Sequence, residues 1–484
     1  MVVLLTNRPE YANDIAEEIR LFLGFCDIRF ERAADAELTI SIDLFEKEQN
    51  AFAAVAADGG GQRCELEFRM ESDAHFVRKK LEKRHMKLAV YHLMRALYPA
   101  IEPPWGSLTG IRPTKLFREL SRDRNELEAA RIFTETFCVS ANKTALAARI
   151  AAAQEPVLRS IGAHDLDVYV GIPFCRTRCA YCSFGSVVPK DTAMLDSYLD
   201  VLFQDISLGA RLVQDGGYRL RAVYVGGGTP TILSAAQLDE LLATLYSAYG
   251  SLGEELTVEA GRPDTIDREK LSVLLAHGVN RISINPQTMN DETLRRMGRA
   301  HSEADTIGAF SMAREMGFSW INMDLIAGLP GESPADMAHS CRIIEELSPE
   351  NLTVHALALK RSSGLKATLG GAALPSQQEA ETMLRIGAET AASLNMQPYY
   401  MYRQKYMSGN LENVGYAKPD YVCRYNIDMM EEGCSILAHG AGAMTKRVFD
   451  DENRIERVPA PKDVNTYMQK LALLDEKKRA QFLD

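Results

Sequence analysis

Short runs rich in Val, Ile, Leu and Tyr alternate with amphipathic stretches through the middle of the chain, and the alternation repeats six times. The runs predict strands at residues 167–172, 221–226, 255–260, 280–285, 320–328 and 351–357. Helices, several with a Ser or Asp cap, are predicted at 194–213, 234–249, 267–277, 302–316, 334–347 and 377–394. Six strand–helix units predict an α/β fold, a partial (β/α)6 TIM-like barrel. A doubly wound sheet is the alternative.

The regions on either side of this repeat have other patterns. Residues 1–150 mix short strands and helices and predict a separate N-terminal α+β domain. The repeat itself predicts a barrel domain over residues 165–395. Residues 396–484 hold too many aromatic side chains for a tail, so we expect a C-terminal region that packs over one end of the barrel. A chain of 484 residues has room for two or three such domains.

The charge balance argues against several classes of partner. The formal net charge is −11, so the chain offers no broad basic surface for nucleic acid or an anionic membrane. The N-terminus lacks the pattern of a signal peptide, and no apolar run approaches the roughly 20 residues of a membrane span. We therefore expect a cytosolic protein, in which the nine cysteines are reduced thiols.

Three cysteines, Cys175, Cys179 and Cys182, lie within eight positions directly after the first predicted strand. Phe184 follows where a fourth cysteine could have stood. Structural zinc usually has four protein ligands, and no further His or Cys lies close to the three. Three thiolates instead suit a [4Fe–4S] cluster with one iron left open to a small molecule. The pattern favours the cluster over zinc.

Polar or glycine residues end the predicted strands. Residues 226–230, "GGGTP", follow the second strand and allow a ligand to approach the backbone closely. Glu259 ends the third strand and can hold an ammonium group or a ribose hydroxyl. Gln287, Asp324 and His355 follow or end the next three. Because a barrel gathers its site at the carboxyl ends of its strands, we expect these residues to share one site.

Two further stretches combine basic and aromatic residues. Arg299 and His301 follow the fourth strand, and Arg299 there can pair with a carboxylate or form a surface ion pair. Residues 400–406, "YMYRQKY", alternate aromatic rings with Arg403 and Lys405. This second pattern suits either a flat ring with acidic arms or a contact between domains.

An ordered series of motifs resembles the radical S-adenosylmethionine (SAM) superfamily, and within it the oxygen-independent coproporphyrinogen III oxidase group (HemN/HemW-like). The series comprises "YVGIPFCRTRCAYCSF", "VYVGGGTPT", "VEAGRPDT", "RISINPQTMNDETLRRMGRAH", "NMDLIAGLPGE" and "HGAGA". It runs from about residue 169 to 445. The stretches "TGIRPTKL" and "YRQKYMSGNLENVGYA" look like the HemZ branch, which extends the resemblance to most of the chain.

The resemblance implies roles for individual residues. Cys175, Cys179 and Cys182 would hold the cluster, whose open iron binds the amine and carboxylate of SAM. Gly227 and Gly228 would bind the methionyl group. One or two SAM sites would be lined by Tyr169, Glu259, Gln287, Arg299 and Asp324. Reduction of the cluster would cleave SAM to a 5′-deoxyadenosyl radical, which takes a β-hydrogen from a propionate before the loss of CO2 and an electron leaves a vinyl group. Two such cycles convert coproporphyrinogen III to protoporphyrinogen IX.

The implied substrate is an acidic tetrapyrrole, and a reduced flavodoxin or ferredoxin type protein would supply electrons. Acidic propionates need basic partners, so we predict that Arg112, Lys115, Arg403 and Lys405 include substrate contacts. Arg112 and Lys115 belong to residues 104–116, which we interpret as a loop dense in Pro and Gly.

Three departures from the family patterns keep other functions open. The oxidase has a further cysteine where this chain has Phe184, and a histidine where it has Gly171. The haem-chaperone relatives carry an "HNxxYW" motif where this chain reads "RYNIDM" over 424–429. The alternatives are a haem-binding, chaperone-like protein without turnover and a radical SAM enzyme that degrades haem or transfers methyl groups.

Overall fold

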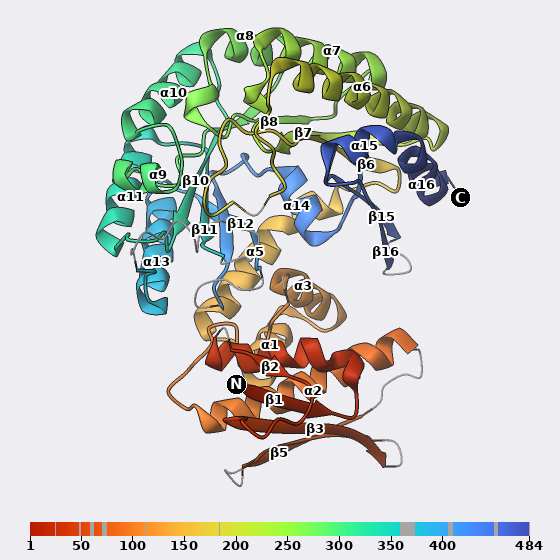
Figure 1. Cartoon of the computed structure of the whole chain (residues 1–484), viewed down its shortest axis with the longest axis vertical. Coiled ribbons are helices and arrows are strands. Elements are labelled where there is room, and N and C mark those ends of the chain that lie inside the picture. Colours follow the sequence, from red (N-terminus) through yellow and green to blue (C-terminus); the bar gives the residue numbers. More distant parts are fainter. Residues whose placement is uncertain are drawn as a thin grey trace. The chain divides into compact units, whose positions relative to one another are not determined.

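The protein, represented by a computed structural model, forms two compact units (Figure 1). Unit 1 comprises residues 1–148 and 403–406, and unit 2 comprises residues 149–402 and 407–484. The structure describes residues 1–24, 26–47, 50–58, 62–69, 75–110, 112–182, 184–358, 373–404, 410–449 and 454–483. The division into three domains with boundaries at 150, 165 and 395 stays a prediction.

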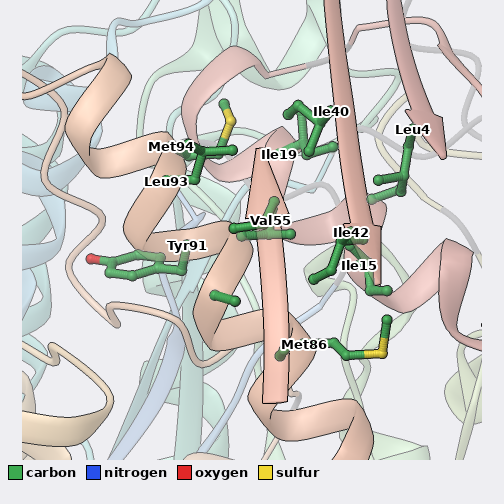
Figure 2. Close-up of a cluster of buried hydrophobic side chains, with 14 of the residues drawn as sticks. Leu4, Ile15, Ile19, Ile40, Ile42, Val55, Met86, Tyr91, Leu93 and Met94 are labelled. Atoms are coloured by element: carbon green, nitrogen blue, oxygen red, sulfur yellow. The ribbon is translucent and has the colours of Figure 1, made fainter. Parts of the chain in front are cut away.

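Unit 1 is built around a five-stranded sheet with the order β2-β1-β3-β4-β5. Its strands are β1 (Val2–Thr6), β2 (Ile28–Arg29), β3 (Leu38–Lys47), β4 (Asn50–Ala57) and β5 (Arg63–Arg69). β1 pairs in parallel with β2 and β3, whereas β3, β4 and β5 form antiparallel pairs. Ile40, Ile42 and Val55 of this sheet pack against Ile15 of α1 (Ala12–Leu23) and Met86 of α2 (His75–Leu97), as Figure 2 shows.

The predicted loop 104–116 is only partly a loop. Helix α3 (Pro113–Asp123) begins inside it, and Arg112 is its N-cap residue. Proline suits the first helical position because its fixed φ matches the helix and its missing N–H has no partner there. Lys115 therefore lies on a helix, and the interpretation of its segment as a loop was wrong. Helices α4 (Glu126–Arg131) and α5 (Ala141–Arg159) follow, and the division between the units falls inside α5.

Unit 2 contains six parallel strands in chain order, which confirms the predicted partial barrel (Figure 1). The strands are β6 (Asp165–Ile172), β7 (Arg219–Gly227), β8 (Glu255–Glu259), β9 (Arg281–Ser283), β10 (Ile321–Ala327) and β11 (Asn351–Ala356). Every one of them overlaps a predicted strand. The sheet curves without closing, because strands from the C-terminal region pair with both β6 and β11.

Helices cover the outer face of this curved sheet (Figure 1). They are α6 (Thr192–Asp215), α7 (Ala235–Tyr249), α8 (Arg268–Ala276), α9 (Asp291–Arg296), α10 (Glu303–Met316), α11 (Pro334–Leu347) and α13 (Gln377–Ser393). Ser234, Ser302 and Ser376 form capping boxes at the starts of α7, α10 and α13, which explains why the sequence located these helices well. Among the residues that the structure describes, no helix is both long and apolar enough to cross a bilayer.

The two faces of the parallel sheet differ in chemistry. Side chains alternate along a strand, so residues in register on neighbouring strands share a face. Outward residues such as Val168, Val223 and Ile282 are buried and apolar. The inward register row Tyr169, Tyr224, Thr257 and Arg281 is aromatic and polar instead. The inward row Ser283, Asn322 and Asn351 is polar throughout. The inner face therefore cannot pack as an ordinary apolar barrel core.

The C-terminal region extends both edges of the sheet, which corrects the expectation that it lies over one end. The full order is β12-β13-β11-β10-β9-β8-β7-β6-β14-β15-β16. The added strands are β12 (Gln397–Tyr402), β13 (Asn413–Ala417), β14 (Ser435–His439), β15 (Met444–Phe449) and β16 (Arg454–Pro459). Helix α14 (Arg424–Glu431) alone follows the expectation in part. Its N-terminal Arg424 and Tyr425 backbone amides bond to Glu255, at the first position of β8.

A buried charge network anchors the last helices, α15 (Val464–Gln469) and α16 (Leu471–Leu483), to α6. The carboxylate of Asp205 accepts hydrogen bonds from Lys478 Nζ at 2.7 Å and Tyr467 OH at 2.8 Å, and its Oδ1 lies 3.0 Å from His439 Nδ1. Burial disfavours the charge on Asp205, but Lys478 and His439 outweigh it and lower the pKa of Asp205. Both charged partners are buried, so neither can turn to water when the other is removed.

We expect Lys478→Ala to lower the free energy of unfolding by about 3–5 kcal/mol, because it leaves the Asp205 charge buried without its main partner. Urea titration followed by circular dichroism measures the change. Lys477→Ala removes an exposed lysine from the same helix and serves as the control, with an expected effect below about 0.5 kcal/mol. Equal stability of the two variants would contradict the assignment.

Candidate functional site

The three clustered cysteines lie on a loop that follows β6 and closes on itself. The backbone N–H of Cys175 donates to the carbonyl of Val187 at 3.0 Å, and that of Cys182 donates to Cys179 at 3.0 Å. Cys175 is buried, whereas Cys179 and Cys182 are half-buried. Phe184 has 69% of its surface exposed. The cysteine loop, residues 174–187, thus holds three thiols close together at the carboxyl end of the first parallel strand.

The glycine run after β7 packs directly under the cysteine loop. Gly228 donates to the carbonyl of Ile172 at 2.8 Å. A Cβ atom at Gly228 would lie 2.3 Å from the carbonyl oxygen of Phe174 and 3.0 Å from Cys175 Sγ. Gly227 has φ of +117°, a conformation that other residues rarely adopt. Both glycines are therefore needed to bring the two loops together.

Arg299 is buried and points at the cysteine loop. Its guanidinium donates to the hydroxyl of Tyr181 at 3.0 Å and to the carbonyl of Asn285 at 2.6 Å, and it lies 3.9 Å from Cys179 Sγ. Arg299 is buried, so it does not form the surface ion pair, and its acceptors are the Tyr181 hydroxyl and the carbonyls of Gly261 and Asn285. Its positive charge therefore lies next to Cys179.

His301 lies near Arg299 without acting as an acid at neutral pH. Burial, helped by the charge of Arg299, lowers the pKa of His301 to about 4. Its Nδ1 is 3.9 Å from a carboxylate oxygen of Asp264, too far for a hydrogen bond. We conclude that His301 is a neutral packing residue.

Six side chains on the inner face of the sheet stay half-exposed although the strands around them are buried. We call them the inner-face group: Tyr169, Tyr224, Glu259, Asp324, His355 and Tyr402. In β6, β8, β10 and β11 each is the one residue of its strand that is not buried. Water therefore reaches the inner face at these side chains, which makes the space beside them a candidate binding site.

Glu259 is held in this site by a tyrosine. The hydroxyl of Tyr224 donates to Glu259 Oε1 at 2.6 Å, and the ring of Tyr224 stacks on Tyr425 with centroids 4.6 Å apart. Tyr169 adds a third ring to this stack, at 6.3 Å from Tyr224 and 6.2 Å from Tyr425. Burial raises the pKa of Glu259 to about 7, and the nearby Asp324 carboxylate acts in the same direction. Glu259 therefore changes its charge near neutral pH.

Asp324 keeps its charge although it lies on the same face. Asn322 Nδ2 donates to Asp324 Oδ1 at 2.8 Å, and His355 Nε2 lies 3.6 Å from Asp324 Oδ2. Burial alone would raise the pKa of Asp324, but His355 and Asn322 outweigh it and lower that pKa. Glu259 and Asp324, the two acids of the inner-face group, thus differ in charge state because they contact different side chains.

Gln287 has an unusual backbone conformation. Its φ is +71°, in the left-handed region that a residue with a side chain rarely adopts. Two hydrogen bonds hold it there: its N–H donates to Asp324 O at 2.9 Å, and its carbonyl accepts from Ile326 N at 2.8 Å. Such conformations cost of order 1–3 kcal/mol and cluster at ligand sites. The strain turns the chain after β9 at the same edge of the sheet as Asp324.

Comparisons with known proteins agree with this geometry. Residues 169–344 match the family described as the radical SAM superfamily. The chain is 33% identical to the oxygen-independent coproporphyrinogen-III oxidase-like protein HemZ of Bacillus subtilis over 463 residues, covering 93% of this chain and 91% of that protein. The chain belongs to the radical SAM superfamily and its HemN/HemW-like group.

Two more distant relatives in this group have different named functions. The heme chaperone HemW of Escherichia coli is 30% identical over 305 residues, with 63% of this chain and 76% of HemW covered. The solved structure of coproporphyrinogen III oxidase (HemN) from Escherichia coli, described as a radical SAM enzyme, matches with a TM-score of 0.53 and 25% identity. That match covers 67% of this chain and 73% of HemN. The fold and the family are therefore shared across proteins of different named functions.

Membership of the radical SAM superfamily implies a [4Fe–4S] cluster and SAM. Three thiols on one loop fit such a cluster, because thiolate is its preferred ligand. Among the described residues, only Asp167, Asp428 and Cys434 place three potential ligand atoms all within 4.8 Å of one another.

The Asp167, Asp428 and Cys434 group has another explanation in this radical SAM protein. Arg221 Nε donates to Asp428 Oδ2 at 2.7 Å, so a cation already occupies one side of the carboxyl pair. Burial, followed by the charge of Asp428, raises the pKa of Asp167. We interpret the two acids as a pair that shares a proton beside Arg221.

The predicted substrate contacts lie outside the inner-face group. Arg112 and Lys115 belong to unit 1, and so does Arg403 despite its place between β12 and β13. Arg403 is buried, with its guanidinium over the ring of Trp105 at 5.6 Å and a hydrogen bond to the carbonyl of Leu108. Lys405 lies outside the described residues. A role of these four in substrate binding stays a prediction.

Tyr224 and Arg281 are inner-face residues that sequence reasoning missed. Tyr224 lies in the quoted run "VYVGGG", where alternation with two buried valines already indicates a face opposite the helices. Arg281 is the one charged residue of β9, and nothing in the neighbouring sequence indicates that it is buried on the inner face.

We expect Gly228→Ala to weaken iron binding, because the added Cβ collides with Phe174 and Cys175. Overpacking of this kind costs about 1–3 kcal/mol, enough to displace the loop. Iron and sulfide content after anaerobic reconstitution measures the effect. Gly185→Ala, in the cysteine loop itself, is the control, since nothing lies within 4 Å of a Cβ there. Wild-type iron content in Gly228→Ala would show that the close approach is not needed.

Proposed function

We propose that this radical SAM protein acts on a tetrapyrrole, and that it oxidatively decarboxylates the propionates of coproporphyrinogen III to vinyl groups. Cys175, Cys179 and Cys182 would hold the [4Fe–4S] cluster. The cluster and SAM, when bound, supply a carbon-centred radical strong enough to remove hydrogen from an unactivated carbon. The arrangement that carries this proposal is the three-thiol loop seated on the glycine run, above a polar inner face.

Several residues of the chain would each contribute to binding SAM. Gly227 and Gly228 would bind the methionyl group, next to the cysteine loop whose close approach their missing Cβ atoms allow. Glu259 offers a carboxylate to its ammonium group, and Gln287, Asp324 and Tyr169 line the same face. Arg299 would act through the loop, since its guanidinium faces Cys179 Sγ. Tyr169 would also bound the space in which the radical forms.

The tetrapyrrole substrate is supported by relatives whose names specify coproporphyrinogen or heme. HemZ covers 93% of this chain at 33% identity, which makes it the better guide than HemW at 63% coverage. The inner-face tyrosines fit a flat, partly apolar ring system. A reduced flavodoxin or ferredoxin type protein is the expected electron donor.

Turnover under anaerobic conditions tests the function. The reconstituted protein receives reductant, SAM and coproporphyrinogen III, and mass spectrometry follows 5′-deoxyadenosine and the porphyrinogen. We expect loss of two CO2 units, abolished in Cys175→Ser, Cys179→Ser and Cys182→Ser. Cys64→Ser, in unit 1, is the control and should retain activity. Formation of 5′-deoxyadenosine without decarboxylation would refute the substrate and keep the radical chemistry.

The affinity for SAM should rise with pH, and Glu259 is the reason. A carboxyl group with pKa about 7 is protonated below neutrality and cannot then pair with an ammonium group. Below pH 7 we expect the affinity to fall by up to about tenfold per pH unit. Equilibrium dialysis of the reconstituted protein measures this. Glu259→Gln should bind SAM weakly with no such pH dependence, whereas the exposed Glu240→Gln control should keep it. The same pH slope in Glu259→Gln would contradict the assignment.

A further inference from the structure

His355 is the one half-exposed residue of β11, a strand that is otherwise buried. It faces the same side of the sheet as Thr353, and Thr353 is in register with Asp324 of β10. Its side chain has 23% of its surface exposed, compared with 17% for Asp324. His355 therefore reaches the water-accessible space on the inner face rather than packing into the core.

The two ring nitrogens of His355 have different neighbours. Nε2 lies 3.6 Å from Asp324 Oδ2, and Nδ1 lies 3.4 Å from the hydroxyl oxygen of Tyr402. Both distances exceed those of strong hydrogen bonds, so His355 loses little when a new partner approaches. The carboxylate of Asp324 attracts a positive charge on the imidazole.

Charges near His355 come from several elements. Asp324 on β10 is ionised, and Tyr400 and Tyr402 contribute phenols from β12. Glu259 and Arg281 interact electrostatically with Asp324 from β8 and β9. Arg281 itself is buried. Within the inner-face group, His355 is thus the residue that can present a positive charge to the open space.

We propose that His355, positioned beside Asp324, donates a hydrogen bond to a carboxylate arm of the substrate and so selects an acidic tetrapyrrole. This inference rests on the proposed function and names a residue that recognises its substrate. A carboxylate gains a charge-assisted hydrogen bond from an imidazole N–H, which replaces the long contact to Tyr402. His355 contacts the substrate and takes no part in cleaving SAM.

Binding of a fluorescent tetrapyrrole tests the inference without requiring turnover. Coproporphyrin III and its tetramethyl ester are titrated anaerobically against the reconstituted full chain. The wild type should bind the free acid more tightly than the ester. His355→Gln and His355→Leu should lose about 10- to 100-fold in affinity for the free acid, the range of one hydrogen bond to a charged group. Their affinity for the ester should not change.

The ratio of the affinities for the free acid and the ester gives a readout that a purely structural role would not change. The wild type should bind the free acid clearly more tightly than the ester. In His355→Gln the two affinities should be nearly equal. The control is His339→Gln, which removes a half-exposed histidine that pairs with Glu303 on α10. Iron content, equal in all variants, establishes that they fold and load the cluster normally.

The possible outcomes distinguish a failure of the His355 inference from a failure of the proposed function. Wild-type binding of the free acid with unchanged affinity in both His355 variants overturns the role of His355 alone. Variants that bind the free acid and the ester equally weakly also overturn it, because the lost contact would not involve the carboxylate. A wild type that binds neither compound and decarboxylates nothing overturns the proposed function together with this inference.

Discussion

The parallel sheet of unit 2 carries polar side chains on its inner face, and the rest of the unit depends on how they are satisfied. At the amino ends of the strands the C-terminal region satisfies them. Glu255 accepts hydrogen bonds from the first backbone amides of α14 at 2.7 and 3.4 Å, and Arg221 pairs with Asp428 of the same helix. A carboxylate at a helix N-terminus is favoured by the helix dipole. This end of the inner face is thereby closed.

The carboxyl ends of the same strands are not closed in this way. There Glu259, Asp324 and His355 stay half-exposed, and their partners are single side chains rather than a packed helix. The cysteine loop joins this end because Gly228 admits Phe174 and Cys175 to contact distance. A polar interior that is closed at one end and open at the other makes a site next to the loop, which is why the thiols and the inner-face group can serve one reaction.

Much of the fold could be predicted from the sequence because local signals agreed with the tertiary structure. Strand residues such as Val168 and Val223 are buried and apolar, Ser234 and Ser302 mark the starts of α7 and α10, and both kinds of signal are local. The C-terminal region was harder to predict. Strand pairing depends on partners distant in the chain, so nothing near residue 435 indicates that β14 pairs with β6.

The sequence by itself determined the succession of strands and helices along the chain, the three-cysteine spacing and the glycine run, because each rests on neighbouring residues or on fixed spacing. Only the tertiary structure decided which polar residues face water on the inner face and which are buried. Arg299 follows a predicted strand and His355 ends one. Arg299 is buried against Tyr181, whereas His355 reaches the open space on the inner face. Charge, burial and exposure of such residues depend on side chains brought together from several strands, which no local pattern in the chain records.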